Sequence, residues 1–356
     1  MCAMSMIGEA KNIYSSEDLK QFAERAFKKL GLTANDAALV TSSLIQADLW
    51  GHQSHGIMRI FWYGARILSG ATHVSSTPTT IVDSGAITVI DGNNGIGQVI
   101  AHNAMKQAIA RAKKHGIGAV AVRNSGHFGT AMYFTRLAAL AGCIGFLSSN
   151  ASPAMAPWGG RQKLIGTNPW SIAAPAGAYP PMMLDIATTA VARGKLYLAR
   201  QRGEPIPFDW AIDEHGNKTN DPVAGIAGTI LPMAGHKGYA IATMIDVLSG
   251  VLSGSRFADG VTGPYMREGR SGAGHLAIAL NISAFRPLEE FCHDMEQLIA
   301  KIKNTPRTPE AEEIFYPGEL EARNEQHHLK IGVSIPQDTI AELNASAQEL
   351  GIDGLT

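Results

Sequence analysis

One short segment combines three groups that can bind and protonate an organic acid. Ser54 and His55 are followed by Arg59, and Tyr63 comes four residues after that arginine. If a helix begins near residue 56, Arg59 and Tyr63 share one face, and the hydroxyl and imidazole lie at the helix N-terminus, where an anion is favoured. An arginine fork can hold a carboxylate while a histidine transfers a proton. The alternative interpretation is a helix cap with a surface arginine.

A second segment places a histidine where α/β proteins bind ligands. His127 lies between Gly126 and Gly129, in a polar loop that directly follows a predicted strand at residues 118–123. Open α/β sheets bind their ligands at the C-terminal ends of strands, and a histidine there can act as a general acid or base. A structural loop histidine is the alternative.

Three further segments carry weaker signals. Asn168, in the turn at residues 166–169, offers an amide on a constrained backbone. Asp185 precedes a predicted helix, where an ordinary N-cap is the alternative. Lys237 lies in a cationic loop just before a predicted helix that begins at Tyr239, which favours an anion, and a solvated surface loop is the alternative.

Other catalytic motifs are absent. The turn at residues 91–97 follows a strand and precedes a helix, but Ile100 replaces the third glycine of a dinucleotide fingerprint and no ribose-binding acid follows. We therefore interpret it as a turn that needs positive φ. The chain also lacks the nucleotide phosphate loop, the hydrolase nucleophile elbow and the zinc-protease motif. His52 and His55 have no third ligand nearby, so no metal site is predicted.

The charge of the chain is balanced overall and uneven locally. Its 356 residues contain 30 Lys and Arg against 31 Asp and Glu, and this net charge of -1 argues against a binder of nucleic acids or membranes. Residues 92–184 contain no Asp or Glu. We expect this basic stretch to attract a small carboxylate and a dinucleotide. Its cations are Lys106, Arg111, Lys113, Lys114, Arg123, Arg136, Arg161 and Lys163.

Cysteine usage and hydropathy point to the cytoplasm. Cys2, Cys143 and Cys292 are far apart and odd in number, which favours neither a disulfide framework nor a paired metal motif. The start of the chain, residues 1–14, lacks the apolar region of a signal peptide. The apolar stretches are also too short to cross a bilayer, which needs about 20 residues.

The pattern of elements predicts an α/β fold. Short β-branched runs alternate with amphipathic segments, so at least part of the sheet is expected to be parallel, and the length favours two domains. Pro and Gly are so dense at residues 152–181 that loops are expected there. Helices are predicted at 16–49 with a break at Gly31, 98–115, 130–141, 239–252 and 286–303, and strands at 87–90, 118–123, 144–148 and 275–282.

Taken in order, these segments resemble the type 2 malate/L-lactate dehydrogenase family of NAD(P)-dependent oxidoreductases. The resemblance spans nearly the whole chain, and residues 244–252 look most like the ureidoglycolate dehydrogenase branch. The matching stretches are Ser54-His55-Gly56-x-x-Arg59, Ser125-Gly126-His127, Gly166-Thr167-Asn168-Pro169, Asp185-x-Ala187-Thr188, Gly235-His236-Lys237-Gly238 and Tyr316-Pro317-Gly318-Glu319.

The resemblance implies a non-Rossmann α/β fold with a cofactor domain on a mixed sheet and a mainly helical domain formed from both chain ends. On this basis, residues 1–75 with 321–356 form the helical domain, and residues 76–320 bind cofactor and substrate. It also implies an intertwined homodimer whose active site is shared between neighbouring subunits.

The resemblance also implies roles for single residues. His55 and His127 match proton donors or acceptors, and Arg59 matches the residue that holds the substrate carboxylate. Further substrate-side positions are Ser54, Tyr63 and Asn168. The nicotinamide-cofactor contacts match Asp185, Ile186, Ala187, Thr188 and Lys237, and the loop near the adenosine ribose matches Gly318, Glu319 and Leu320.

The implied reaction moves a hydride between nicotinamide C4 and C2 of a small 2-hydroxy or 2-oxo acid, without a metal. Glu319 would accept ribose hydroxyls and repel a 2′-phosphate, which favours NAD and leaves NADP open. Two alternatives stay open, namely reduction of the C=N bond of a cyclic imino acid and a non-catalytic cofactor-binding protein. The acid, the direction and the histidine that moves the proton are also left open.

Overall fold

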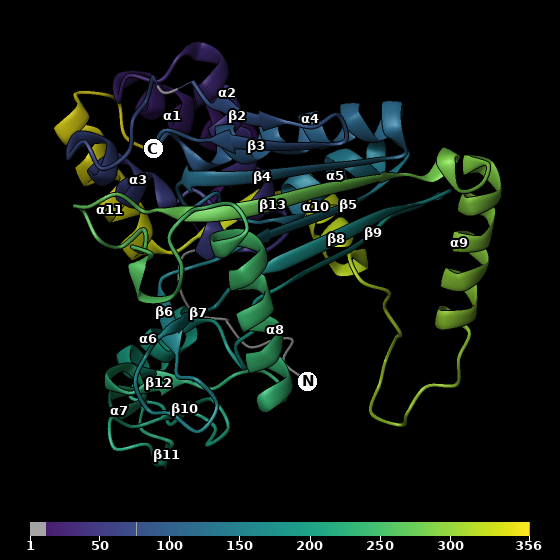
Figure 1. Cartoon of the computed structure of the whole chain (residues 1–356). Helices are drawn as coiled ribbons and strands as arrows, with labels where there is room; N and C mark the ends of the chain where they lie inside the picture. Colours follow the sequence, from purple (N-terminus) through teal and green to yellow (C-terminus); the bar gives the residue numbers. More distant parts are fainter. Residues whose placement is uncertain (1–11, 76, 356) are drawn as a thin grey trace. The chain divides into compact units, whose positions relative to one another are not determined.

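The computed structural model describes residues 12–75 and 77–355 (Figure 1). Cys2 and most of the segment used for the targeting expectation lie outside the described residues. The chain divides into two compact units, which we describe separately. Unit 1 contains residues 1–64 and 321–356, and unit 2 contains residues 65–320.

Unit 1 is mainly helical, and its first two helices begin at strong caps. The hydroxyls of Ser15 and Thr33 accept hydrogen bonds from Asp18 N and Asp36 N, both at 3.1 Å, and satisfy amides that a helix start leaves free. Both helices and the break near Gly31 confirm the sequence prediction. The elements are β1 (Asn12–Tyr14), α1 (Ser16–Lys29), α2 (Ala34–Leu49), the 3-10 turn η1 (Gln53–His55), α3 (Arg59–Leu68), α10 (Glu319–Ile331), β14 (Val333–Ile335) and α11 (Gln337–Leu350).

Unit 2 is built on a seven-stranded sheet with the order β2-β3-β4-β13-β5-β8-β9. Its strands are β2 (Thr79–Asp83), β3 (Ile87–Asp91), β4 (Ile117–Ser125), β5 (Cys143–Ser149), β8 (Trp170–Ala176), β9 (Tyr179–Ile186) and β13 (Ala273–Asn281). β3 and β4 pair in parallel, and the other neighbours pair antiparallel. The predicted mixed-sheet α/β fold is therefore confirmed.

Helices of unit 2 lie on both faces of this sheet, and two more, α6 (Arg193–Arg202) and α7 (Pro222–Ala227), belong to a separate subdomain. The others are α4 (Gly97–His115), α5 (Met132–Leu140), α8 (His236–Asp246) and α9 (Leu288–Lys303). α4 and α5 share one buried core with Leu147 of β5. On the opposite face, Ser148 Oγ lies 2.9 Å from Ser249 Oγ, in the π-helical turn Val247–Val251 that continues α8.

The loop prediction for residues 152–181 is wrong. This segment contains β6 (Pro153–Met155), β7 (Ile165–Gly166), β8 and the start of β9. β8 is an interior strand with alternating buried positions, as expected of a half-buried strand. β9 is an edge strand, and Pro180 and Pro181 lie where its register with β8 shifts, between the pairs Ala174–Met182 and Ala176–Tyr179, so the prolines are tolerated at an edge and a bulge. The prolines at the start of β9 are therefore the reason why the sequence pattern did not predict this strand.

A small subdomain of unit 2 lies between β9 and α8. It contains α6, α7 and a three-stranded sheet of β10 (Ala211–Ile212), β11 (Lys218–Thr219) and β12 (Thr229–Ile230). Leu196, Ile206 and Ile230 belong to its own buried core. This subdomain therefore has a core separate from the one beneath α4 and α5. Among the described residues, no helix combines the length and apolar character needed to span a bilayer.

Candidate functional site

The parallel strands β3 and β4 end in one network that shapes the His127 loop. The Asp91 carboxylate accepts hydrogen bonds from Arg123 Nε at 2.8 Å, Asn124 Nδ2 at 2.9 Å and Asn93 N at 2.8 Å. Although burial alone would raise it, these three hydrogen bonds hold the pKa of Asp91 below its usual value. The two strand ends are thus tied together by an ionised carboxylate.

The turn at residues 91–97 needs positive φ, as predicted, but its asparagines adopt it. Asn93 and Asn94 have φ of 50° and 57°. Gly97 serves a different purpose, because a Cβ there would lie 2.5 Å from Gly126 O and 2.7 Å from the carbonyl carbon of His127. The first turn of α4 therefore presses directly on the backbone of the His127 loop.

His127 itself is half-buried, and its hydrogen bond defines its tautomer. Nδ1 accepts a hydrogen bond from Gly129 N at 3.2 Å. Because this bond uses the Nδ1 lone pair, the neutral ring carries its proton on Nε2. Nε2–H is then the donor that His127 can offer to an oxygen.

Asp185 does not cap a following helix, so that part of the sequence interpretation is wrong. It lies in β9, and the next helix, α6, begins only at Arg193. Its Oδ2 instead accepts a hydrogen bond from Met132 N at 2.9 Å, in the first turn of α5. Since Met132 follows His127 by five residues, Asp185 anchors the end of the His127 loop from another strand.

The Thr167 and Thr188 segments meet the start of α8. Thr188 N and Thr188 Oγ1 both donate to Thr167 O, at 2.9 and 2.8 Å, and Met233 N donates to Thr188 O at 3.0 Å. Gly238, in the first turn of α8, lies so close to Met233 that a Cβ would overlap its carbonyl group. Three segments that are distant in the sequence therefore form one wall.

α8 begins earlier than predicted, at His236 instead of Tyr239. Lys237 therefore lies in the first turn of the helix, with an exposed side chain. Gly235 at the N-cap supplies no side-chain acceptor, and this turn contains no acid. The helix dipole and the lysine both favour an anion at this end.

Asn168 is buried, and both ends of its amide are already bonded. Oδ1 accepts a hydrogen bond from Ala151 N, and Nδ2 donates to Ala242 O, each at 2.9 Å. The side chain therefore ties its turn to α8 and to the loop after β5.

The late loop at residues 316–320 lies against the edge of β9. Met183 N donates to Pro317 O at 3.0 Å, two residues before Asp185. Gly318 has φ of 92°, and a Cβ there would lie 3.0 Å from Met183 N, so both conformation and space demand glycine. The structure thus brings the two predicted cofactor segments together, with Leu320 half exposed.

Glu319 is not a free acceptor for a ribose. Its side chain is buried, with Oε1 at 2.6 Å from Lys303 Nζ and Oε2 accepting a hydrogen bond from Tyr316 N at 3.3 Å. Glu319 therefore favours NAD over NADP less than the sequence predicted, because Lys303 compensates the negative charge that would repel a 2′-phosphate.

In unit 1, the helix predicted near residue 56 starts later, and α3 begins at Arg59. Ser54 and His55 belong to η1, where Ser54 Oγ lies 2.9 Å from His55 Nδ1. Arg59 is buried and donates through Nε to Ser54 O at 2.6 Å, and its guanidinium lies 4.4 Å from the centre of the Trp62 ring. Tyr63 is buried one helical turn after Arg59.

The histidine of this cluster is held neutral. Desolvation, followed by the charges of Arg59 and His52, lowers the pKa of His55 to about 3. A neutral imidazole and a buried guanidinium therefore occupy the same turn. The guanidinium suits a carboxylate, whereas the lowered pKa of His55 differs from the near-neutral value that the sequence interpretation expected of a proton-transfer group.

Two buried polar residues, Asp48 and His275, were not predicted from the sequence. Asp48 in α2 accepts a hydrogen bond from Ile57 N at 2.7 Å, beneath the turn of His55. His275 in β13 lies 3.0 Å from Ser149 Oγ through Nδ1, with its ring centre 4.8 Å from that of Phe128. Their only sequence signal is a titratable residue within an otherwise apolar element.

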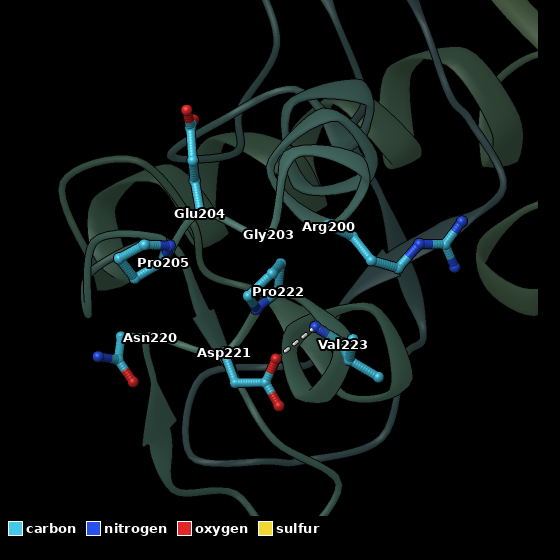
Figure 2. A pocket seen from close by; sticks show the side chains of 8 residues that line it. All are labelled: Arg200, Gly203, Glu204, Pro205, Asn220, Asp221, Pro222 and Val223. Carbon is cyan, nitrogen blue, oxygen red and sulfur yellow. Dashed lines mark hydrogen bonds between the residues drawn. The ribbon is translucent and has the colours of Figure 1, made fainter.

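A cavity of about 350 Å³ lies elsewhere, in the small subdomain. Figure 2 shows its lining, in which the Asp221 carboxylate accepts a hydrogen bond from Val223 N at 2.8 Å. None of the predicted site residues lines it. The remaining lining residues are Arg200, Gly203, Glu204, Pro205, Asn220 and Pro222. Across residues 12–75 and 77–355, no group of three or more His, Cys, Asp or Glu side chains is placed so that it could hold a metal ion.

Comparisons with known proteins identify the family of this chain. The malate/L-lactate dehydrogenase family matches residues 14–344. A malate dehydrogenase from Pyrococcus abyssi is 40% identical over 95% of both chains, and the NAD(+)-dependent ureidoglycolate dehydrogenase of Escherichia coli K12 is 35% identical over 94% of this chain and 95% of its own. The solved sulfolactate dehydrogenase of Methanocaldococcus jannaschii superimposes with a TM-score of 0.91 at 37% identity, covering 96% of this chain and 98% of its own.

These matches cover nearly the full chain in both sequence and structure. The protein therefore belongs to the malate/L-lactate dehydrogenase family, whose members here are oxidoreductases of hydroxy acids. The predicted family is confirmed, and the ureidoglycolate dehydrogenase branch is among its relatives.

Proposed function

We propose that this protein is a nicotinamide-dependent dehydrogenase that moves a hydride between the cofactor and C2 of a small 2-hydroxy or 2-oxo acid. The observation that carries the proposal is the meeting of the His127 loop with Asp185, through the 2.9 Å bond to Met132 N. This contact joins a proton-transfer group to a segment of predicted cofactor contacts. The family relationship supports the reaction class.

Each proposed residue has a chemical task. The Gly129 bond orients the neutral ring of His127, whose Nε2–H donates a hydrogen bond to the substrate oxygen on C2. In the direction of reduction, the protonated form of His127 gives its Nε2 proton to that oxygen while the hydride reaches C2, and the ring is left neutral; oxidation reverses both transfers. Arg59 holds the substrate carboxylate, and neutral His55 beside it supplies a further donor or acceptor. Ser54 and Tyr63 flank the bound acid. When bound, the nicotinamide supplies or accepts the hydride.

The residues in unit 2 fit a dinucleotide. The hydroxyls of Thr189 and Thr130 are buried and have no hydrogen-bond partner among the described residues, one next to Thr188 and the other three residues after His127. Such unsatisfied groups indicate that a polar ligand completes the site. We propose that Lys237 and the start of α8 attract the pyrophosphate, while residues 185–188 and 318–320 hold the rest of the cofactor. NAD is the proposed cofactor, with NADP as the alternative.

A substrate panel with NADH and NADPH tests this function. We expect turnover of at least one of the 2-oxo acids related to malate, lactate, sulfolactate or ureidoglycolate. His127→Ala is expected to lower kcat by about 10²–10⁴-fold, and Arg59→Ala to raise KM for the acid most. His215→Ala and Arg25→Ala, at exposed positions, serve as controls. Turnover of only cyclic imino acids would instead establish C=N reduction, and cofactor binding without any turnover would contradict catalysis.

We also propose a cytoplasmic homodimer with a shared active site. The proposed substrate residues His55 and Arg59 belong to unit 1, and His127 belongs to unit 2. If these residues come together across subunits, mixing inactive His127→Ala and Arg59→Ala proteins should restore about one quarter of the activity, because half of the mixed dimers are heterodimers with one intact site. Light scattering that shows only monomers would refute the dimer.

A further inference from the structure

We propose that Asp48 is a positioning residue that holds the His55–Arg59 turn in the conformation that binds the substrate carboxylate. The inference rests on the proposed function of that turn. Asp48 is not part of any motif that carries chemistry, and it lies one helix before the turn, in α2. Its side chain is 1% exposed.

A single hydrogen bond links this carboxyl to the middle of the turn. Asp48 Oδ2 accepts from Ile57 N at 2.7 Å, in a buried position. Ile57 lies between η1, which contains His55, and α3, which begins with Arg59. The bond therefore fixes the backbone that joins the two proposed substrate residues. A buried amide without this acceptor would be costly, which makes the contact a strong restraint.

Gly56 leaves the space that the Asp48 carboxyl occupies. A Cβ at this position would overlap both oxygens and Cγ of Asp48. The φ of Gly56 is -88°, which any residue can adopt, so space and not conformation requires glycine here. The Asp48 carboxyl thus packs directly against the Cα of Gly56, and a larger residue at position 56 would have to move the turn or the carboxyl.

Hydrogen bonds within the turn connect its residues to one another, so a displacement of Ile57 would also move His55 and Arg59. Gly56 N donates to Gln53 O and Arg59 N donates to Gly56 O, each at 3.0 Å, and Arg59 Nε donates to Ser54 O. The bond from Asp48 holds this closed unit at its centre. Losing it would let the imidazole of His55 and the guanidinium of Arg59 shift together.

The carboxyl acts as an acceptor and a spacer more than as a charge. Burial raises the pKa of Asp48 to about 8, so the group is largely protonated at neutral pH. Asparagine has the same shape and retains an acceptor, so Asp48→Asn should preserve the role.

Hydrogen exchange and steady-state kinetics test the proposal together. In Asp48→Ala, amides of residues 52–62 should exchange about tenfold faster, and KM for the acid should rise about tenfold while KM for the cofactor stays within about twofold. Asp48→Asn should match the wild type in all three. Gly56→Ala should behave like Asp48→Ala, with Gly64→Ala as the control, because a methyl there meets only Leu30 at 3.4 Å.

The double variant separates positioning from general damage. If Gly56→Ala acts through its clash with Asp48, it should have little further effect in the Asp48→Ala background. Additive losses, an impaired Asp48→Asn, or a Gly56→Ala enzyme with unchanged KM would each overturn the proposal. If Asp48→Ala does not fold, Asp48→Asn and Gly56→Ala still decide it. Hydrogen exchange needs no turnover, so a wild type that is inactive on every acid refutes the proposed function and leaves the positioning contact testable.

Discussion

Gly97→Ala should damage catalysis more than stability. The glycine begins α4, and its Cα faces the carbonyl groups of Gly126 and His127. A methyl group there would lie 2.5 Å from Gly126 O, whereas ordinary C···O contacts are about 3.3 Å. The His127 loop would therefore have to move by about 0.8 Å, because the sheet and α4 hold the glycine itself in a packed core.

The two effects have different magnitudes. Overpacking of this kind costs about 1–3 kcal/mol, and alanine returns about 1 kcal/mol through helix propensity, so the free energy of unfolding should fall by about 0–2 kcal/mol. A misplacement of nearly 1 Å in a catalytic group can lower the rate by about 10²-fold. We therefore expect kcat to fall about 10²-fold in a protein that is still fully folded.

Urea unfolding and kcat measured under folded conditions check this prediction. Gly194→Ala in α6 is the matched control, because no atom lies within 4 Å of its Cβ position. That control should keep its kcat and gain slightly in stability. A Gly97→Ala enzyme with the kcat of the control would refute the close approach between α4 and the His127 loop.

Three further predictions concern stability and binding. Asn168→Ala leaves two buried partners unsatisfied, so urea unfolding should show a loss of about 2–4 kcal/mol, and an unchanged midpoint would contradict the structural role of the amide. Burial lowers the pKa of His275 to about 3. Between pH 6.5 and 3 the unfolded chain therefore binds a proton that the folded chain does not, and the free energy of unfolding falls as the pH falls. Over this range, His275→Phe should lose up to about 1.4 kcal/mol less unfolding free energy per pH unit than the wild type. Urea unfolding curves that give the same pH dependence for both proteins would disprove this. Finally, if the acid-free residues 92–184 steer anions, calorimetry should show that the affinities for cofactor and acid weaken as salt increases, and salt-independent binding would reduce the acid gap to a feature of packing.

Most helices and strands could be predicted because their signals are local. The caps at Ser15 and Thr33 and the apolar periodicity of α1 and α2 involve residues only a few positions apart. The strands at residues 152–181 could not be predicted, because an edge position that tolerates proline exists only once the sheet is assembled. The domain boundary at residue 75 stays a prediction, and the first part of the compact unit 1 ends at residue 64.

The sequence allowed single site residues to be proposed, but it did not predict the contacts that these residues make. An acid before a helix looks like a cap in any sequence, yet Asp185 caps a helix that starts 53 residues earlier in the chain. Glu319 looks like a ribose acceptor until Lys303 is placed beside it. Asp48 and His275 gave no usable pattern, because a single polar residue in an apolar element is equally compatible with a solvent-facing position.

The linear order of residues was sufficient to identify the available chemical groups, the caps and periodicities of the helices, and the family. The folded chain alone decided why Gly56 and Gly97 must be glycine, which nitrogen of His127 carries its proton, and in which direction the pKa values of Asp48 and His275 move. The physical reason is that steric contact, desolvation and hydrogen-bond pairing depend on neighbours that are distant in the chain. Those neighbours are set by packing, which no local pattern records.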